Sequence, residues 1–291
     1  MIVLAGVLWG VTGLFVNALD GRGFTSMQLV ACRAVITTVL MLVTLLITDR
    51  RLLRVKLRDM WCFVGTGIIS IVMFSYCYFR TMMRTSVSVA AVLLYTAPIM
   101  VIIMSAVLFK ERINLQKGIC CAMAFVGCIL TTGALTGGVN LPADGIVTGL
   151  LSGFGYALYS IFSRIALNKG YNSLTIIFYT FLCANFGVLP FVNVVDTAQK
   201  AFCTDIGTAL MIVAMAIVTT FLPYLLYTGG LTSVEAGKAS IMASVEPVVA
   251  SVCSVVLLAV PMRANEAAGA LLVLGAVVSV NIKVVRKNAE Q

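Results

Sequence analysis

The chain has 291 residues, of which 61% are apolar and only 11% are charged, and its formal net charge is +9. A soluble domain contains about 45–50% apolar and about 25% charged residues, so this chain lacks the charge needed to cover a water-facing surface. A spanning helix takes roughly 20 apolar residues, and ten of them would leave only about 90 residues for loops and tails. We therefore predict an all-α polytopic membrane protein without a separate soluble catalytic domain.

Apolar segments separated by glycine, proline and charged residues predict ten transmembrane helices. In chain order they cover residues 2–18, 26–48, 60–79, 87–109, 116–136, 146–167, 174–195, 208–230, 236–259 and 266–285. The first of them begins at Met1 without a preceding basic segment, so no cleavable signal is expected.

Lysine and arginine are distributed unevenly between the loops on the two sides of these spans. On the side of both chain ends, thirteen are found: Arg50, Arg51, Arg54, Lys56, Arg58, Lys110, Arg112, Lys117, Arg164, Lys169, Lys283, Arg286 and Lys287. On the opposite side, five are found: Arg22, Arg80, Arg84, Lys200 and Arg263. Because cytoplasmic loops carry an excess of Lys and Arg, this bias predicts that both termini are cytoplasmic. Membrane topology also explains the basic residues better than a nucleic-acid partner does.

Short sequence similarities recur between the two halves of the chain at an offset of 147 to 149 residues. The matched pairs are Gly6-x-x-Trp9-Gly10 with Gly153-x-x-Tyr156-Ala157, Ser26 with Ser173, Thr85-Ser86-Val87 with Thr232-Ser233-Val234, Pro98 with Pro247, and Gly127 with Gly275. They predict two repeats, over residues 1–136 and 146–287. Each repeat holds five spans, so the second must enter the membrane from the opposite face. Inverted repeats of this kind are typical of secondary transporters.

Several of these stretches resemble the EamA family of the drug/metabolite transporter superfamily. They are Leu8-Trp9-Gly10, the run from Ala90 to Pro98 that continues to Phe109-Lys110-Glu111-Arg112, the run from Gly149 to Arg164, and Val245-Glu246-Pro247-Val248. The resemblance implies ten spans and a central cavity open to one side at a time, through which small metabolites pass. Family members handle amino acids, sugars, nucleotide derivatives and drugs. The chain departs from the family where the acid that Glu111 supplies in the first repeat is replaced by Ala259-Val260-Pro261 in the second.

Two charged residues are predicted deep inside spans. Glu246 is the only acid far from a span end, and a charge there costs about 3 kcal/mol on insertion scales. It can bind a substrate ammonium group or exchange a proton, or it can make a structural hydrogen bond within the helix bundle. Arg33 can hold a carboxylate, because a guanidinium forms bidentate pairs. It can equally pair with an acid or with backbone carbonyls.

Aromatic residues recur at matching depths in the two halves, and their rings suit a pocket for apolar or cationic solutes. They are Trp9, Tyr76, Tyr78 and Tyr95 in the first half and Tyr156, Tyr159, Tyr224 and Tyr227 in the second. An interfacial aromatic belt is the competing explanation. Since the resemblance places cavity residues on spans one, three, four, six, eight and nine, it favours Trp9, Tyr76, Tyr95 and Tyr156. The candidate substrate-binding residues are Trp9, Arg33, Tyr76, Tyr95, Tyr156, Tyr159, Tyr224 and Glu246.

Pro98 and Pro247 lie within spans at equivalent positions of the two halves. Each removes one helical hydrogen bond and crowds the preceding turn, so a kink or a broken helix is expected. Proline is tolerated in spans generally, but the symmetric pair favours two hinges that line a cavity.

The sequence therefore predicts a secondary transporter, independent of ATP, for amino acids or related amphipathic or cationic solutes, working by alternating access across the cytoplasmic membrane of a bacterium. The expected partners are the lipid bilayer and the small-molecule substrate, with a proton or a second solute as a possible counter-transported species. Neither a metal nor a cofactor is expected, because the chain has no His, no C-x-x-C pair and no nucleotide-binding motif. A passive channel or a non-transporting scaffold is the alternative. An enzyme is not expected, because no nucleophile with a base and no close pair of acids is found within a span.

Overall fold

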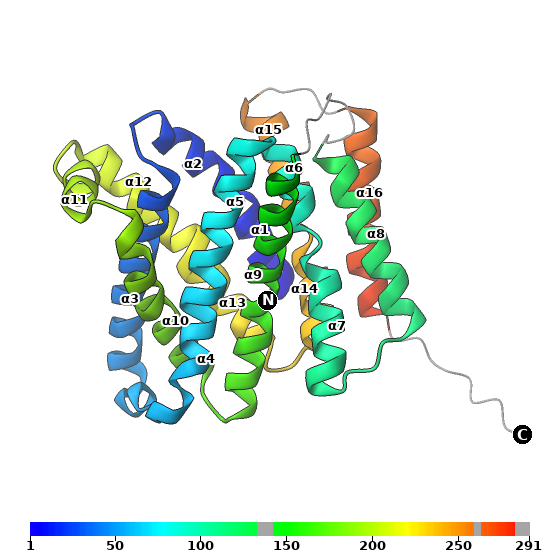
Figure 1. Cartoon of the computed structure of the whole chain (residues 1–291), viewed down its shortest axis with the longest axis horizontal. Helices are drawn as coiled ribbons and strands as arrows, with labels where there is room; N and C mark the ends of the chain where they lie inside the picture. The colour runs from blue at the N-terminus through cyan, green and yellow to red at the C-terminus, as the bar shows by residue number, and fades with distance from the viewer. Residues whose placement is uncertain (133–141, 259–262, 283–291) are drawn as a thin grey trace, which may run out of the picture.

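The computed structural model describes residues 1–132, 142–258 and 263–282, and in these residues the chain forms helices and no strands. Nine helical stretches among them are long and apolar enough to cross a membrane. The helices stand side by side in a bundle and run between its two ends (Figure 1). This is the architecture of an all-α polytopic membrane protein, as the composition predicts.

The nine stretches are built from sixteen shorter elements in chain order. In the first half they are α1 (Ile2–Gly10) with α2 (Thr12–Asp20), α3 (Ser26–Thr48), then η2 (Leu57–Asp59), α4 (Met60–Val64), the π-helix η3 (Gly65–Val72) and α5 (Met73–Arg84) in one stretch, and α6 (Val87–Leu94) with α7 (Ala97–Phe109). In the second half they are α9 (Ala143–Asn168), α10 (Ser173–Val188) with η5 (Leu189–Phe191), α12 (Ile206–Ala216) with the π-helix η6 (Ile217–Phe221) and α13 (Leu222–Gly230), α14 (Ala236–Ala243) with α15 (Glu246–Leu258), and α16 (Ala264–Asn281).

The segment predicted as the fifth span forms a shorter apolar helix, α8 (Leu115–Thr131), of 17 residues. Some features predicted from the sequence lie outside the described residues: positions 133–136, 259 and 283–285 of three predicted spans, the family departure at Ala259-Val260-Pro261, and the basic residues Lys283, Arg286 and Lys287. The count of ten spans therefore stays a prediction.

One helix was not predicted at all. The sequence predicts a single span over 174–195, but α10 and η5 end at Phe191 and a separate amphipathic helix, α11 (Val194–Phe202), follows. The cause is local. Pro190 has no N–H to continue the helix, and the Asn193 side chain accepts a hydrogen bond from the Asp196 N–H at 3.1 Å, which starts a new helix.

Two spans are interrupted at their prolines. Helix α6 ends at Leu94 and α7 begins at Ala97, next to Pro98. In the second half, α14 ends at Ala243 and α15 begins at Glu246, next to Pro247. The two interruptions lie at equivalent positions of the proposed repeats. Whether they act as hinges stays a prediction.

Helix α1 lies inside the bundle because its glycines allow close contact with α14 and α15. A Cβ atom on Gly6 would come within 2.8 Å of the Ala243 carbonyl oxygen, and one on Gly10 within 2.7 Å of the Glu246 carbonyl oxygen. Such separations are shorter than van der Waals contact, so only glycine fits. Glu246 is thereby placed next to α1.

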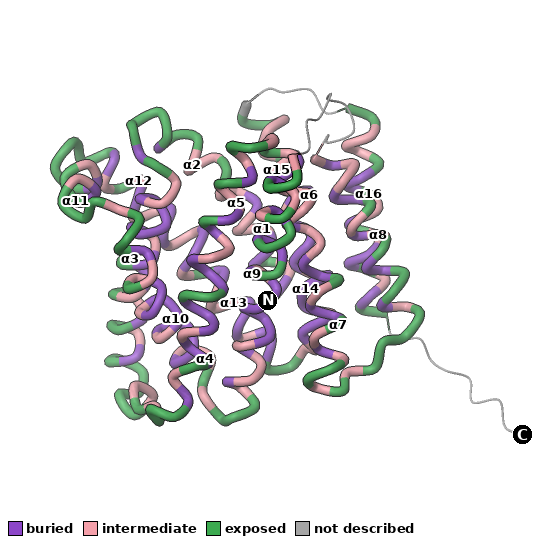
Figure 2. Tube along the Cα trace, viewed as in Figure 1, coloured by how far each residue is buried: buried purple, intermediate pink, exposed green. Residues whose placement is uncertain are grey.

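Exposed residues lie on the outward faces of the peripheral helices and at both ends of the bundle (Figure 2). Many of the outward-facing side chains are large and apolar, among them Val39 on α3 and Val107 on α7. Such a surface suits lipid chains and not water. We name the ends by a residue at each: the Arg22 end, where α2 ends and α12 begins, and the Lys117 end, where α7 ends and α14 begins.

Candidate functional site

Seven aromatic side chains meet in the middle of the bundle, and we call them the aromatic cluster. They are Trp9 on α1, Phe74 on α5, Tyr156 and Tyr159 on α9, Phe181 on α10, and Tyr224 and Tyr227 on α13. The Trp9 ring centroid lies 5.5 Å from that of Tyr224 and 5.3 Å from that of Tyr227. The Tyr159 and Tyr224 rings meet edge to face at 4.9 Å. Edge-to-face pairs of this kind are favourable beyond the area they bury.

Hydrogen bonds fix the orientation of two rings in the aromatic cluster. The Tyr159 hydroxyl lies 2.6 Å from Thr228 Oγ1, and the Tyr227 hydroxyl lies 2.7 Å from Ser160 Oγ. Both tyrosines are buried, so a lost partner would leave a hydroxyl without compensation. These contacts join α9 to α13 across the centre of the molecule.

A small cavity of about 10 Å³ lies within the aromatic cluster. Its lining also includes Ser70, whose hydroxyl donates to the Gly155 carbonyl oxygen at 2.7 Å. A volume of this size holds about one water molecule. A metabolite enters this place only if the surrounding helices move apart.

The carboxylate of Glu246 lies beside the aromatic cluster. It interacts electrostatically with the hydroxyl groups of Tyr95 and Tyr156. Within the described part of the chain, Glu246 forms no hydrogen bond or ion pair. As the first residue of α15, it is also near the positive end of that helix dipole. A half-buried carboxylate with no cation beside it is a suitable partner for a substrate ammonium group.

Arg33 on α3 approaches the other side of the aromatic cluster, where it interacts electrostatically with Tyr224. Its Nε is buried without a hydrogen-bond partner, and the described residues offer the side chain no ion pair. A guanidinium in this condition is a suitable partner for a carboxylate.

The structure brings together most of the residues predicted for the site. Trp9, Tyr156, Tyr159 and Tyr224 lie within the aromatic cluster, and Glu246 and Arg33 flank it. Tyr95 lies at the end of α6, where it packs against a buried group around Cys128 and Val248 and interacts with Glu246.

Tyr76 is not part of this arrangement. Its ring is 39% exposed, packs on Phe191 at 5.2 Å and accepts a hydrogen bond from Arg80. Phe74, two residues earlier, supplies the aromatic ring that α5 contributes to the aromatic cluster. The sequence analysis missed Phe74, Phe181, Ser70 and Ser160. No sequence signal distinguishes these from the many other phenylalanine and serine residues in apolar helices.

The site offers polar and aromatic contacts but little reactive chemistry. Among the described residues, no group of three or more His, Cys, Asp or Glu side chains lies close enough to hold a metal ion. The groups present suit recognition of a charged or amphipathic solute.

At the Lys117 end, buried charges join segments that are far apart in the sequence. Lys117 Nζ lies 2.6 Å from Glu235 Oε2, in an ion pair without hydrogen-bond geometry, and 3.9 Å from Glu111 Oε2. Glu111 Oε1 in turn accepts a hydrogen bond from the Ala236 N–H at 3.1 Å. The loop after α7 is therefore held against the start of α14.

A second contact at this end pairs Lys169 with Asp59, whose atoms lie 2.5 Å apart. The hydrogen bond to the Asp59 carboxylate raises the pKa of Lys169 above its ordinary value. Tyr171 also donates to Asp59, at 2.7 Å.

The Arg22 end carries charged contacts that are more exposed. Arg22 reaches Asp205 at 3.4 Å and also donates to the Thr208 hydroxyl. Hydrogen bonds from Thr208, with a contribution from the charge of Arg22, hold the pKa of Asp205 below its ordinary range. The hydrogen bond from Lys200, with a second one from Gln28, does the same for Asp196.

Residues 1–133 and 143–282 match the EamA-like transporter family. The chain is 28% identical to an uncharacterized transporter of Archaeoglobus fulgidus, over 76% of this chain and 77% of that protein. It is 24% identical to the uncharacterized transporter YdfC of Bacillus subtilis, over 83% and 79%. It is 21% identical to the uncharacterized inner membrane transporter YicL of Salmonella typhimurium, over 97% and 94%. One solved crystal structure shares the fold, with a TM-score of 0.78 at 17% identity over 96% of this chain and 95% of that one.

Proposed function

The chain belongs to the EamA-like transporter family, and we propose that it is a secondary transporter that moves amino acids or related amphipathic and cationic metabolites by alternating access. Its apolar helices and its relatives make it a multi-pass membrane protein. The observation that carries the substrate class is the unpaired carboxylate of Glu246 beside the aromatic cluster. Membership of a transporter family favours transport over catalysis.

The proposed mechanism needs two inverted repeats, over residues 1–136 and 146–287, with ten spans in all. A reciprocal contact supports them. Gly6 of the first half packs on the Ala243 carbonyl of the second, and Gly153 of the second packs on the Leu93 and Leu94 carbonyls of the first, with a Cβ on Gly153 coming within 2.9 Å of Leu93 O. Gly6 and Gly153 are equivalent positions in the two proposed repeats, and so are Leu94 and Ala243. Two halves that exchange the same contact are suited to move against each other.

Alternating access follows from the size of the site. A cavity of about 10 Å³ is far smaller than the roughly 300–1,000 Å³ of sites that bind small molecules. A solute therefore requires a second arrangement of the helices, open to one end. The breaks next to Pro98 and Pro247 are the proposed hinges, because a helix lacking hydrogen bonds at one point bends there at the lowest cost.

The contents of the site support an amphipathic substrate. Aromatic faces attract cations, and Glu246 supplies the opposite charge for an ammonium group. Arg33, on the far side of Tyr224, is the proposed partner of a carboxylate. A free amino acid carries both groups, which makes it the first class to test.

Direction, coupling and location are part of the same proposal. The excess of Lys and Arg in the loops of one side supports cytoplasmic termini. One relative is named an inner membrane transporter, which supports the cytoplasmic membrane of a bacterium. Glu246 is the proposed carrier if a proton is exchanged for the substrate.

A thermal-shift screen of the purified protein, followed by flux into liposomes, tests this function. The panel contains amino acids, polyamines, nucleosides and quaternary amines. A ligand that binds the folded state at a hundredfold excess over Kd stabilises it by about 2.7 kcal/mol. We expect a hit among the amino acids or amines that is lost in Glu246→Gln and in Tyr156→Phe. Asp144→Asn and Tyr76→Phe, an acid and a tyrosine outside the site, serve as matched controls.

The proposal fails if the reconstituted protein moves none of these solutes, or if the control variants lose as much binding as the site variants. Single-channel currents would instead support a passive channel.

A further inference from the structure

We propose that the groove beneath α11 holds one acyl chain of a membrane phospholipid. The groove has a volume of about 190 Å³ and lies between α3, the end of α10 and α11. It is separate from the aromatic cluster, and nothing in the transport mechanism above uses it. Its lining includes Ala31, Val35, Leu189, Val194, Ala198 and Phe202.

The groove is a hollow that side chains of the protein do not fill. Protein interiors are close-packed, and an empty apolar space loses the contacts that its lining atoms would otherwise make. An apolar hollow of about 150 Å³ inside a protein is large enough to bind benzene. The groove beneath α11 exceeds that size, so a hydrocarbon chain fits its volume.

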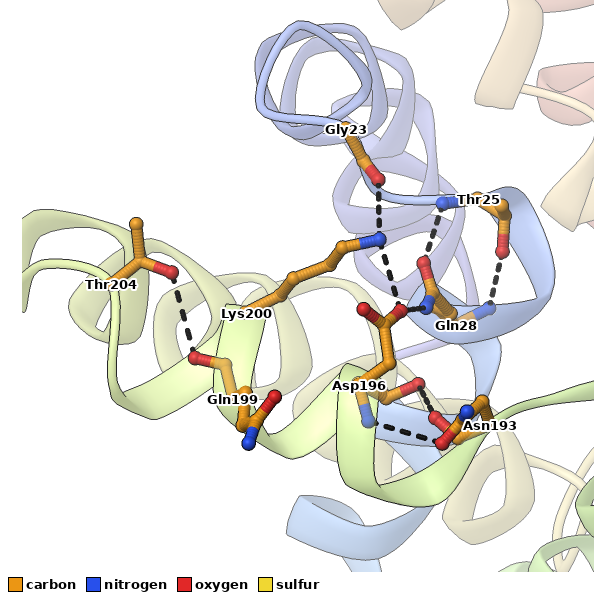
Figure 3. A network of polar contacts seen from close by, with 9 residues as sticks. Gly23, Thr25, Gln28, Asn193, Asp196, Gln199, Lys200 and Thr204 are labelled. Atoms are coloured by element: carbon orange, nitrogen blue, oxygen red, sulfur yellow. Dashed lines mark hydrogen bonds and ion pairs between the residues drawn. The ribbon is translucent and has the colours of Figure 1, made fainter.

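Polar contacts on the other side of α11 keep the groove from closing. Gln28 Nε2 donates to Asp196 Oδ2 at 2.7 Å, and Lys200 Nζ donates to the Gly23 carbonyl at 3.2 Å (Figure 3). Gln28 is itself fixed by reciprocal hydrogen bonds with Thr25 at the start of α3. These contacts hold α11 to the start of α3 and to the loop before it. The apolar side of α11 therefore stays in place over the hollow.

The position and chemistry of the groove identify its occupant. Val35, Leu189, Val194 and Phe202 line it and are each about half exposed, so the groove opens on the outside of the bundle. The neighbouring outward-facing side chains, such as Val39, are apolar as well. The groove is therefore continuous with the surface that faces the lipid.

A polar solute would not be stable in this groove. Its polar groups would lose their hydrogen bonds to water and find almost no replacements among the lining residues. The carboxamide of Asn185 also lines the groove, but its nitrogen already donates to the Thr38 hydroxyl at 2.9 Å. An acyl chain needs no hydrogen bonds and is present on every side of a membrane protein.

The groove also touches the substrate site from behind. Ala31, Cys32 and Val35 of α3 line it, while Arg33, in the same turn, faces Tyr224. A bound chain would pack on the outer side of the turn that carries Arg33. The lipid would thus help to hold this side chain in position.

Native mass spectrometry of the full-length, delipidated protein tests the proposal, with 1-palmitoyl-2-oleoyl-phosphatidylethanolamine as the added lipid. We expect the wild-type protein to retain one lipid after the detergent is removed. Ala198→Phe places a ring in the groove and should lower the retained fraction at least fivefold, while Ala198→Leu should lower it less. Ala198 is exposed, so neither change crowds the protein core.

The matched control is Val195→Phe, which adds a ring to the same helix at an exposed position that does not line the groove. It should retain the lipid as the wild type does, and all variants should show the same thermal midpoint without lipid. Equal retention in Ala198→Phe and the wild type would overturn the proposal. So would a mass showing a dimer, or a co-purified molecule without acyl chains, in place of the lipid.

Discussion

The two ends of the bundle are held together by charged contacts of different depth. At the Lys117 end, the side chains of Lys117 and Glu111 are 5% and 9% exposed. At the Arg22 end, the side chains of Arg22 and Asp205 are 38% and 51% exposed. Both sets of contacts join the first half of the chain to the second, so each end can hold the halves together.

The difference in depth predicts a difference in strength. An exposed ion pair is worth about 0–1 kcal/mol, because water and salt screen it. Removing one partner from a buried pair costs several times more, because the other charge is left without compensation. A transporter that opens one end at a time would therefore open the Arg22 end more easily, and the Lys117 end would need a larger driving force.

The largest effect is expected for Lys117→Met. The change leaves the carboxylates of Glu111 and Glu235 close to each other without a cation. Breaking a buried pair costs about 3–5 kcal/mol, which we reduce to about 2–4 kcal/mol because Glu235 is half exposed. Thermal unfolding of the purified protein measures the loss, with Arg22→Met as the matched change at the other end.

If Arg22→Met destabilised the protein as much as Lys117→Met, the difference between the ends would not exist. The double variant Lys117→Met/Glu235→Met provides a further check. It should recover part of the loss, because an apolar pair replaces two charges.

A smaller effect is expected for Glu235→Gln, which keeps the shape of the side chain and removes its charge. Lys117 keeps Glu111 as its counter-ion, so the fold should persist while the Lys117 end opens more often. A charged contact worth about 1–1.4 kcal/mol corresponds to a fivefold to tenfold change in the open population. Cys120 reports that population, because it is 1% exposed and packs between α8 and Ile241 of α14.

The rate at which a maleimide modifies Cys120 should rise by that factor in Glu235→Gln. Cys203, which is exposed at the Arg22 end, gives an internal reference that should not change. An unchanged rate at Cys120, or a rise of the same size in Asp205→Asn, would show that Glu235 does not hold the Lys117 end closed.

Much of the fold could be predicted from the sequence because membranes restrict it to apolar helices. Helix α11 shows where this reasoning stops. Hydropathy runs without interruption through the predicted span 174–195, and only Pro190 and Asn193 mark the point where the chain turns into a second helix. The placement of α11 then depends on Gln28, far away in the sequence. No local pattern contains that contact.

The site shows a similar limit. Trp9 and Tyr156 were predicted as cavity residues from their depth and from the matched repeats, and they do meet. Tyr76 was predicted on the same grounds but faces away. Successive helical residues are about 100° apart, so Tyr76 points about 200° from Phe74. The π-helix η3 (Gly65–Val72) just before them shifts the phase of the helix. That shift cannot be read from the sequence.

Acid should loosen the Arg22 end. The pKa of Asp196 and that of Asp205 are both lowered in the folded protein, so their contribution to stability is present above the ordinary Asp value of about 3.9. It is lost as the pH falls through the lower folded values. A fluorophore on Cys203, at the end of α11, should report no change from about pH 8 to pH 5 and a change below about pH 4.

The same fluorophore in Asp196→Asn provides the control. The signal at neutral pH should already be shifted towards the acid form, and the remaining transition should be smaller. A wild-type transition centred near neutral pH would point to a different group.

The smallest effect is expected at the second contact of the Arg22 end, where Arg84 Nε lies 3.3 Å from Asp144 Oδ2. Both side chains are about half exposed, so water already solvates each charge when the pair is open. The Arg84→Met variant should therefore lose no more than about 0.5 kcal/mol of stability, and the loss should shrink as salt is added because screening weakens the pair. Thermal midpoints at low and high salt measure both effects. A loss comparable to that of Lys117→Met would mean that exposure does not set the strength of these contacts, and the Arg22 end would then resist opening as strongly as the Lys117 end.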